Sequence, residues 1–149
     1  MNPEVGMLAY FVLAGPLAWR ETRNLVLQSP NHGIPAGCYG LIEFYCNDRT
    51  CNCRRVVFQV WAKHLPGQIL ATINFGWESA EFYTRWMHGD REAGKEVSGA
   101  TLELLGEQSS LAQPLLHMVR STALTDPDYV DRLKRHYRHV SRIIGRKSR

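Results

Sequence analysis

The sequence lacks the long apolar run that a membrane-spanning helix requires. Its most apolar early stretch, residues 7–19, contains Gly15 and Pro16 and is well short of the roughly 20 residues that cross a bilayer. No basic residue precedes this stretch, so the charged start of a secretory signal peptide is missing as well. We therefore expect a cytoplasmic protein with no membrane partner, in which the four cysteines are reduced.

Recognisable catalytic motifs are also missing. The chain has no glycine-rich phosphate-binding loop, no nucleophile elbow and no His-Glu-x-x-His helix. Catalytic residues are therefore unknown, and no site for an organic cofactor is indicated. Trp61, Trp77 and Trp86 are aromatic enough to stack on nucleic-acid bases, but their positions in the strand and helix patterns predict core residues.

Acidic residues are absent from one end of the chain. Residues 1–131 hold 10 Lys and Arg against all 14 Asp and Glu, a balance of −4, whereas residues 132–149 hold 8 Lys and Arg and no acid. With 44% hydrophobic and 21% charged residues, we expect one globular domain over 1–149 with a basic C-terminal helix and tail over 126–149. Such a tail either binds a polyanion or only keeps the protein in solution.

Three segments alternate between apolar and polar residues, which is typical of strands. They cover residues 38–46, 54–63 and 68–77. A turn at Pro66-Gly67 joins the second to the third, and a short polar loop joins the first to the second. Because short connections favour antiparallel neighbours, the pattern predicts a three-stranded meander.

The apolar spacing becomes helical after these strands. It predicts a helix over 78–88, a loop over 89–100, and a helix that begins at Ser109 or Ser110. Thr125-Asp126-Pro127 begins a last helix, whose apolar residues recur at steps of three and four. Residues 1–30 are open to either strand or helix. We expect an α+β fold in which C-terminal helices pack on an antiparallel meander with a metal-stabilised hairpin tip.

The most informative motif is Cys46-Asn-Asp-Arg-Thr-Cys51-Asn-Cys53, at the tip of the first hairpin. Three explanations compete: a metal site, a set of redox thiols, and small core residues. Buried structural cysteines usually lie among apolar neighbours, whereas these three flank a polar loop. A disulfide between Cys51 and Cys53 would close a very small, strained ring. The motif therefore favours a metal such as zinc, which binds thiolates in a tetrahedron.

The fourth ligand is not defined by this motif. Cys38 lies eight residues before Cys46 on one predicted strand, so the two would be roughly 26 Å apart. In the last helix, His136 is the histidine best able to face the body of the domain, so we predict it as the fourth ligand. The alternatives are His117, Asp48 and a water molecule.

Two functions remain open. The first is a small zinc-binding domain with a structural metal, acting as a binding module for nucleic acid or a protein partner. The second is a metal-dependent enzyme with an open zinc coordination position. For the first, the expected contact surface is a row of cations on the exposed side of the last helix: Arg132, Arg135, Arg138 and Arg142.

A resemblance supports the zinc prediction. The stretch from Glu43 to Val56 resembles a motif of uncharacterised bacterial zinc-binding proteins, in which a Tyr-Cys pair is followed by Cys-x-Cys-Arg-Arg-Val. Some of these proteins are associated with the SEC-C type of zinc-binding segment. The resemblance implies a zinc-binding domain and no established activity. A separate SEC-C tail with its second cysteine pair is absent from this chain.

Overall fold

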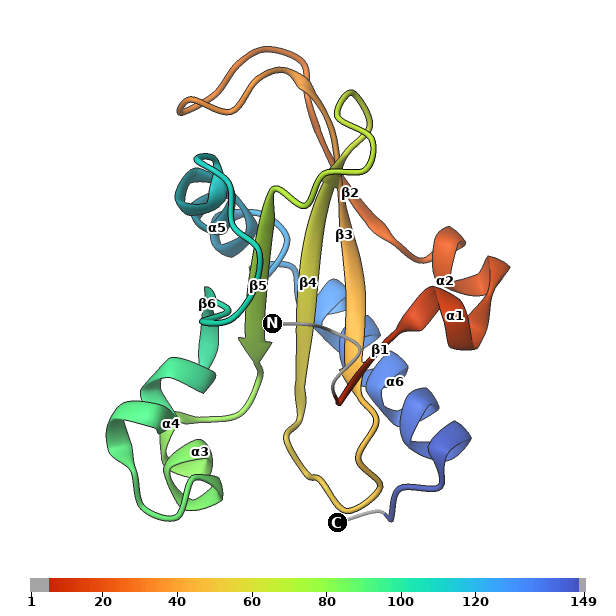
Figure 1. Ribbon diagram of the computed structural model, residues 1–149, viewed down its shortest axis with the longest axis vertical. Helices are drawn as coiled ribbons and strands as arrows, with labels where there is room; N and C mark the ends of the chain where they lie inside the picture. Colours follow the sequence, from red (N-terminus) through yellow and green to blue (C-terminus); the bar gives the residue numbers. More distant parts are fainter. Residues whose placement is uncertain (1–5, 148–149) are drawn as a thin grey trace.

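A six-stranded antiparallel sheet forms the centre of the protein (Figure 1). This computed structural model describes residues 6–147; residues 1–5 and 148–149, the last of which belong to the predicted basic tail, lie outside the described residues. The strand order is β1-β3-β4-β5-β6, and β2 also pairs with β3. The predicted α+β class, with an antiparallel meander and C-terminal helices, is confirmed.

The meander consists of β3 (Gly37–Cys46), β4 (Arg55–Ala62) and β5 (Ala71–Gly76). Nearly every position of these strands is buried, so both faces of the meander are covered. The buried positions are mostly apolar, and the polar ones among them are Glu43, Gln59, Thr72 and Asn74. The third strand begins later than the predicted residue 68. The Gln68 N–H donates to the Leu65 carbonyl, so the chain is still in a turn there.

The N-terminal region, which the sequence left open, alternates between strand and helix. It contains β1 (Met7–Ala9), α1 (Tyr10–Ala14), α2 (Pro16–Arg20) and β2 (Arg23–Leu27). Both β1 and β2 pair with β3, one after the other along its length. The two short helices therefore form a bulge between two strands on the same edge of β3.

The predicted loop over 89–100 is wrong. It contains α4 (Arg91–Val97), which packs against α3 (Ala80–Trp86), and then β6 (Gly99–Leu102). Asp90 caps α4 by accepting a hydrogen bond from the Ala93 N–H. The predicted loop rested on polar residues and glycines, but Gly94 has a packing role. A Cβ at position 94 would lie 2.4 Å from Thr84 Oγ1, so the helices approach closely only with glycine.

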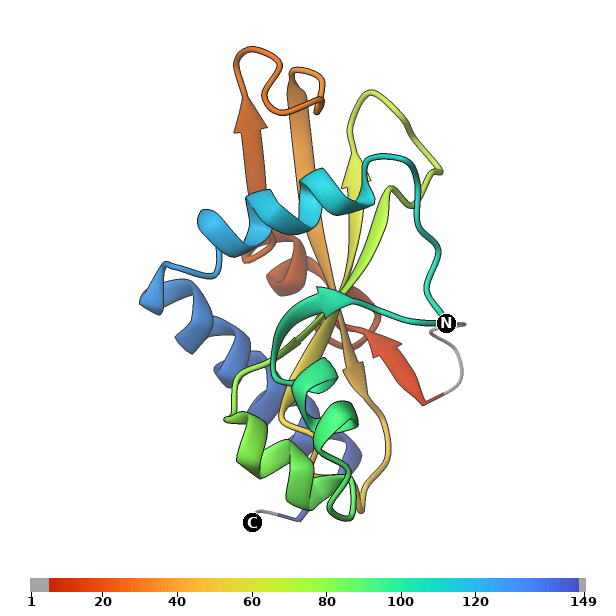
Figure 2. The ribbon, with the colours of Figure 1, turned by 90° about the vertical axis from the view of Figure 1, so that its left-hand side faces the viewer.

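The two C-terminal helices, α5 (Ala112–Ser121) and α6 (Pro127–Ile144), run across one face of the sheet (Figures 1 and 2). Asp126 caps α6 as predicted, and Gly145, at φ 76°, ends it. Most of the predicted apolar stripe of α6 is buried, with Leu133 and Val140 fully so. None of the helices described within residues 6–147 has the length and apolar character to cross a membrane.

The tryptophans predicted to lie in the core are only partly buried. Trp61, Trp77 and Trp86 each pack against core residues along one side and remain partly exposed. Each lies at or near the end of a strand or helix, where neighbouring elements cover only one side of the ring. Trp77 follows β5 and lies close to α6, which places an accessible aromatic ring near the hairpin tip.

Candidate metal centre

The three clustered cysteines come together at the tip of the β3–β4 hairpin. Cys46 is the last residue of β3, and Cys51 and Cys53 lie in the loop before β4. Their three sulfur atoms lie within 4.8 Å of one another. Cys46 and Cys53 are buried and Cys51 is half-buried. The group is one that can hold a metal ion, as the spacing predicts.

Cys38 lies at the other end of β3, as predicted. The strand runs without interruption from Gly37 to Cys46, and at about 3.3 Å per residue it carries the two cysteines far apart. Among the residues that the structure describes, the metal-binding group contains the other three cysteines and not Cys38.

Hydrogen bonds within the cysteine loop turn its backbone back on itself. Asp48 Oδ1 accepts hydrogen bonds from the Thr50 N–H at 2.9 Å and the Thr50 hydroxyl at 2.8 Å. The Cys51 N–H donates to the Asp48 carbonyl at 3.2 Å, and the Asp48 N–H donates to Cys46 Sγ at 3.4 Å. This Asx turn folds the chain back between the first and second cysteines, which is why a five-residue step can still bring both sulfurs to one point.

Two tyrosines fix the other end of the loop. The Tyr83 hydroxyl, from α3, donates to the Arg54 carbonyl at 2.6 Å, and the Arg54 N–H donates to the Tyr137 hydroxyl, from α6, at 3.4 Å. Arg54 itself has φ 46°, a conformation that non-glycine residues rarely adopt. The tyrosine contacts hold this left-handed turn, which places Cys53 in the core.

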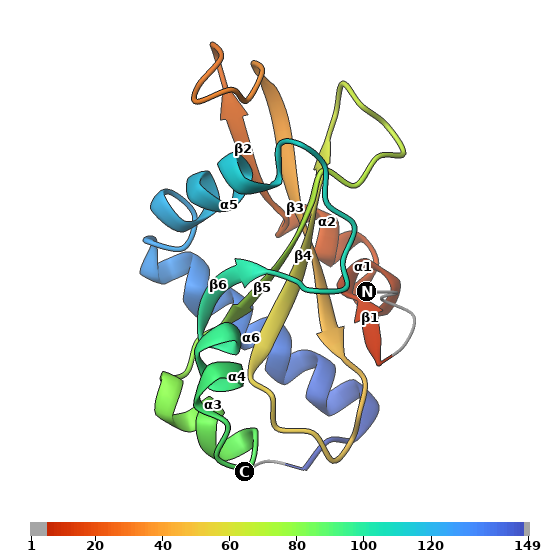
Figure 3. The same cartoon turned by 60° about the vertical axis from the view of Figure 1, so that its left-hand side comes forward.

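The turn that follows α6 reaches the tip from a third side (Figure 3). The Arg146 guanidinium donates to the Cys46 carbonyl and, at 3.2 Å, to the Asp48 carbonyl. It also lies over the Tyr137 ring, 4.7 Å from the ring centre. Sequence reasoning missed Tyr83, Tyr137 and Arg146 as supports of the site. Arg146 follows the helix-ending Gly145, and that stop was the only local sign that its side chain turns back.

The pKa values of the three clustered thiols shift in opposite directions. Hydrogen bonds from the Cys51 and Cys53 thiols lower the pKa of the Cys46 thiol, and the Asp48 N–H and the charge of Arg146 act in the same direction. The same thiol contacts, together with burial, raise the pKa values of Cys51 and Cys53. The cluster therefore carries one thiolate easily and resists the next two, because like charges would face each other. A bound cation removes that repulsion.

The distances suit a small tetrahedral ion. Zinc–thiolate bonds of about 2.3 Å imply sulfur–sulfur separations of about 3.8 Å. The sulfurs, within 4.8 Å of one another, need to approach by only about 1 Å to meet that geometry. Side-chain rotation provides such a shift without moving the strands.

The structure does not bring His136, the predicted fourth ligand, to the cysteines. His136 is fully buried, and both ring nitrogens contact carboxylates: Nδ1 lies 2.6 Å from Glu43 Oε1 and Nε2 lies 3.0 Å from Glu21 Oε1. It faces the body of the domain as predicted, but it contacts β3 and the end of α2. Both nitrogens that could bind a metal are already occupied.

The alternative ligands also lie outside the group. His117 is exposed on α5, where its ring lies 6.2 Å from that of His32. Asp48 is adjacent to Cys46, but its carboxylate accepts from Thr50. Within residues 6–147, no fourth His, Cys, Asp or Glu joins the three cysteines.

The predicted row of arginines on α6 is divided in two. Arg132 donates to the Glu21 carbonyl at 3.1 Å, and Arg135 binds the Glu21 carboxylate through two hydrogen bonds of 3.1 and 2.9 Å. Arg138 and Arg142 are exposed and lie beside the hairpin tip. The first pair therefore binds Glu21, with Arg135 remaining exposed, whereas the second pair lines the surface beside the hairpin tip.

Fold and site together define a small α+β domain with a three-cysteine site that can hold a metal. No protein-family model, curated protein or solved structure matches the chain. The resemblance to the SEC-C-associated bacterial proteins therefore stays a prediction.

Proposed function

We propose that the protein is a small zinc-binding domain with a structural metal site, which acts as a binding module for nucleic acid or a protein partner. The observation that carries the metal part is the convergence of three cysteine sulfurs within 4.8 Å at the hairpin tip. Zinc suits this set because it accepts thiolates in a compact tetrahedron and has no redox chemistry of its own.

A structural role follows from what surrounds the sulfurs. Cys53 is almost fully buried, and the next residue, Arg54, is fixed by tyrosines from α3 and α6. A metal at this point would tie the last residue of β3 to the loop and so to both helices. Such a metal contributes its binding free energy to folding.

The alternative function is a metal-dependent enzyme with an open coordination position. One observation favours it: the described residues provide three ligands, and Cys51 is only half-buried. A water molecule or a substrate atom would then complete the tetrahedron. The environment of the fourth position decides between the two functions.

Metal analysis tests the proposal directly. Protein expressed in zinc-supplemented medium should contain about one zinc per chain. Cys51→Ser and Cys53→Ser should lose it, whereas Cys38→Ser should retain it because Cys38 lies at the far end of β3. A wild-type protein without zinc, or equal zinc in all three variants, would refute the metal site.

Cobalt substitution examines the coordination sphere. Cobalt in place of zinc gives a sulfur-to-metal charge-transfer absorption whose intensity counts the thiolates, and we expect three. Added cyanide or azide should change the visible spectrum if the fourth position is open, as the enzyme alternative requires. An unchanged spectrum favours a closed structural site.

A further inference from the structure

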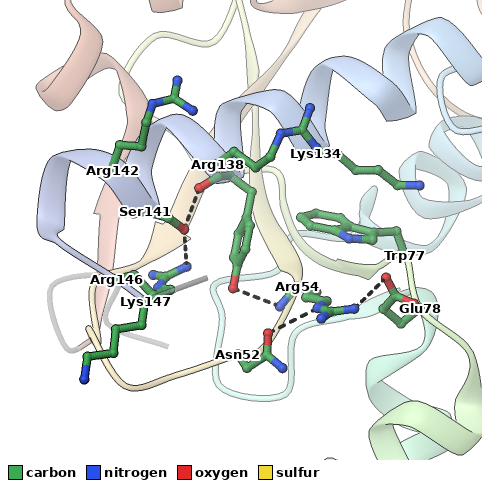
Figure 4. Close-up of a pocket in the computed structure, with 11 residues that line it drawn as sticks. Asn52, Arg54, Trp77, Glu78, Lys134, Arg138, Ser141, Arg142, Arg146 and Lys147 are labelled. Atoms are coloured by element: carbon green, nitrogen blue, oxygen red, sulfur yellow. Dashed lines mark hydrogen bonds and ion pairs between the residues drawn. The ribbon is translucent and has the colours of Figure 1, made fainter. Parts of the chain in front are cut away.

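A hollow of about 490 Å³ lies beside the metal centre, between the cysteine loop and the second half of α6 (Figure 4). Six cations line it, and we call it the basic hollow: Arg54, Lys134, Arg138, Arg142, Arg146 and Lys147. Glu78 is the single acid in its lining. Six positive charges against one negative charge make this a site for an anion.

Two of the six cations are already engaged. Arg54 pairs with Glu78 at 3.4 Å and contacts Asn52, while Arg146 binds the backbone of the cysteine loop. The remaining four form no ion pair with any acidic side chain that the structure describes within residues 6–147. Elsewhere in the protein, arginines such as Arg23 and Arg55 are each paired with an acid. Four cations without an ion pair therefore share one hollow, whereas other described cations without one, such as Lys63 and Arg91, do not line it.

An aromatic ring lies among these charges. Trp77 is partly exposed and lines the hollow, with its ring centre 5.3 Å from that of Tyr137 at a steep angle. In the view of Figure 4 the Trp77 ring stands between the Lys134 and Arg54 side chains. Single-stranded nucleic acids are bound by this combination of cations, which contact phosphates, and an aromatic face, on which a base stacks.

We propose that the basic hollow binds single-stranded nucleic acid, with phosphates at Lys134 and Arg138 and a base against Trp77. A duplex fits less well, because its bases are stacked on one another and are not free to contact the ring. An acidic peptide would satisfy the cations but would leave the tryptophan without a role. This inference rests on the proposed function, since Asn52 and Arg54 reach the hollow from the cysteine loop.

The first test is a charge-matched comparison in the zinc-loaded full chain. Lys134→Gln/Arg138→Gln removes two cations from the hollow, and Arg91→Gln/Lys95→Gln removes two exposed cations from α4. Fluorescence anisotropy with a labelled single-stranded oligonucleotide should show about ten-fold weaker binding for the first variant only. The slope of log K against log salt should decrease by about 1.4, since each single-strand phosphate contact contributes about 0.7.

The second test separates base stacking from charge. Trp77→Leu should weaken oligonucleotide binding about five-fold or more but leave binding of inorganic polyphosphate, which has no bases, unchanged. A polyglutamate peptide should compete poorly with the oligonucleotide. Efficient competition by polyglutamate, or equal loss for polyphosphate and oligonucleotide in Trp77→Leu, would overturn the nucleic-acid assignment.

Zinc content and melting temperature are measured on every preparation, so that the two proposals can fail separately. If Lys134→Gln/Arg138→Gln keeps its zinc and binds the oligonucleotide as tightly as wild type, the basic hollow is refuted and the metal centre stands. If wild type contains no zinc but still loses oligonucleotide binding with that variant, the metal proposal fails and the hollow stands.

Discussion

Two buried polar clusters lie against α6 at consecutive positions, and they are built in opposite ways. In the histidine cluster, His136 lies between the carboxylates of Glu43 and Glu21, and the Tyr45 hydroxyl donates to Glu43 at 2.6 Å. In the cysteine cluster, three thiols face one another. Tyr137 of α6 contacts the loop of this cluster at Arg54. The histidine cluster brings different kinds of polar group together, whereas the cysteine cluster gathers groups of one kind that can hold a cation.

The difference shows why a histidine beside a metal motif need not be a ligand. Positions 136 and 137 differ by about 100° around the helix, so His136 points to β3 and Tyr137 points to the cysteine loop. The histidine cluster should contribute to stability without a bound ion. Removing the metal should therefore affect one cluster and leave the other intact, and the following predictions test that separation.

Loss of the metal should have the largest effect. Structural zinc in small peptides contributes about 10–16 kcal/mol; here the tyrosine contacts hold part of the loop, so we expect chelation to lower the free energy of unfolding by about 5 kcal/mol. For a chain of 149 residues this corresponds to a decrease of about 15 °C in melting temperature. Calorimetry before and after verified zinc removal measures it.

Amide hydrogen exchange locates this effect. After chelation, protection should fall in the cysteine loop and at the start of β4, and it should persist around Glu43 and His136, whose contacts contain no thiol. Cys38→Ser provides the control, because it should melt like wild type and keep its zinc. A melting curve unchanged by chelation would contradict the structural role.

Removing the histidine should have the second-largest effect. His136→Ala removes one hydrogen-bond partner of the buried Glu43 side chain and leaves it the Tyr45 hydroxyl, and depriving a buried carboxyl group of a partner costs about 3 kcal/mol. The variant should nevertheless bind about one zinc per chain. Urea unfolding and metal analysis measure the two quantities.

His117→Ala is the matched control, since His117 is exposed on α5 and was the second candidate ligand. It should change the free energy of unfolding by less than about 0.5 kcal/mol. If His136→Ala folds poorly, His136→Gln keeps a polar group at the position and reports on zinc alone. A folded His136 variant that has lost its zinc would show that the histidine is a ligand after all.

Local patterns were sufficient for the meander and for the cysteine site. The apolar and polar residues that alternate in β4 and β5 lie on opposite faces of the sheet. The three cysteines lie within eight residues, so a single turn determines their proximity. The fourth ligand could not be predicted in this way. Glu43 is 93 residues from His136 in the sequence. The spacing of nearby residues therefore could not predict that a carboxyl group of β3 contacts that histidine.

The errors elsewhere have the same origin. Gly94 is typical of a loop in the sequence, but in the structure it lets α3 and α4 approach. The row of arginines on α6 follows from helical geometry alone, yet Glu21 at the end of α2 divides it. Each of these features depends on a neighbour that is distant in the sequence or on packing between elements, which a periodic pattern does not contain.

The smallest effect should come from the partly exposed edge of the histidine cluster. Hydrogen bonds from Arg135, followed by that from His136, lower the pKa of Glu21 to about 2 from its ordinary value of 4.5. A carboxyl group whose pKa is lower in the folded state adds stability above its unfolded pKa and loses it as the pH falls through the folded pKa. The Glu21 contribution should therefore be complete above about pH 5 and disappear between about pH 4.5 and 2. Glu21→Gln keeps an acceptor for His136 but loses the charge, so at neutral pH it should lower the free energy of unfolding by about 1 kcal/mol, a value reduced by the exposure of Arg135.

Acid also protonates the cysteines and releases any zinc, so the measurement is the difference between wild type and Glu21→Gln, both stripped of metal. Urea unfolding at several pH values between 7 and 2.5 should show the two free energies converging as the pH falls below 4.5, because the charge that distinguishes the proteins is being lost. A constant difference down to pH 2.5 would mean that the ion pair of Glu21 with Arg135 does not contribute to the stability of the histidine cluster. Convergence with unchanged zinc affinity at neutral pH would show that the two clusters on α6 are stabilised independently.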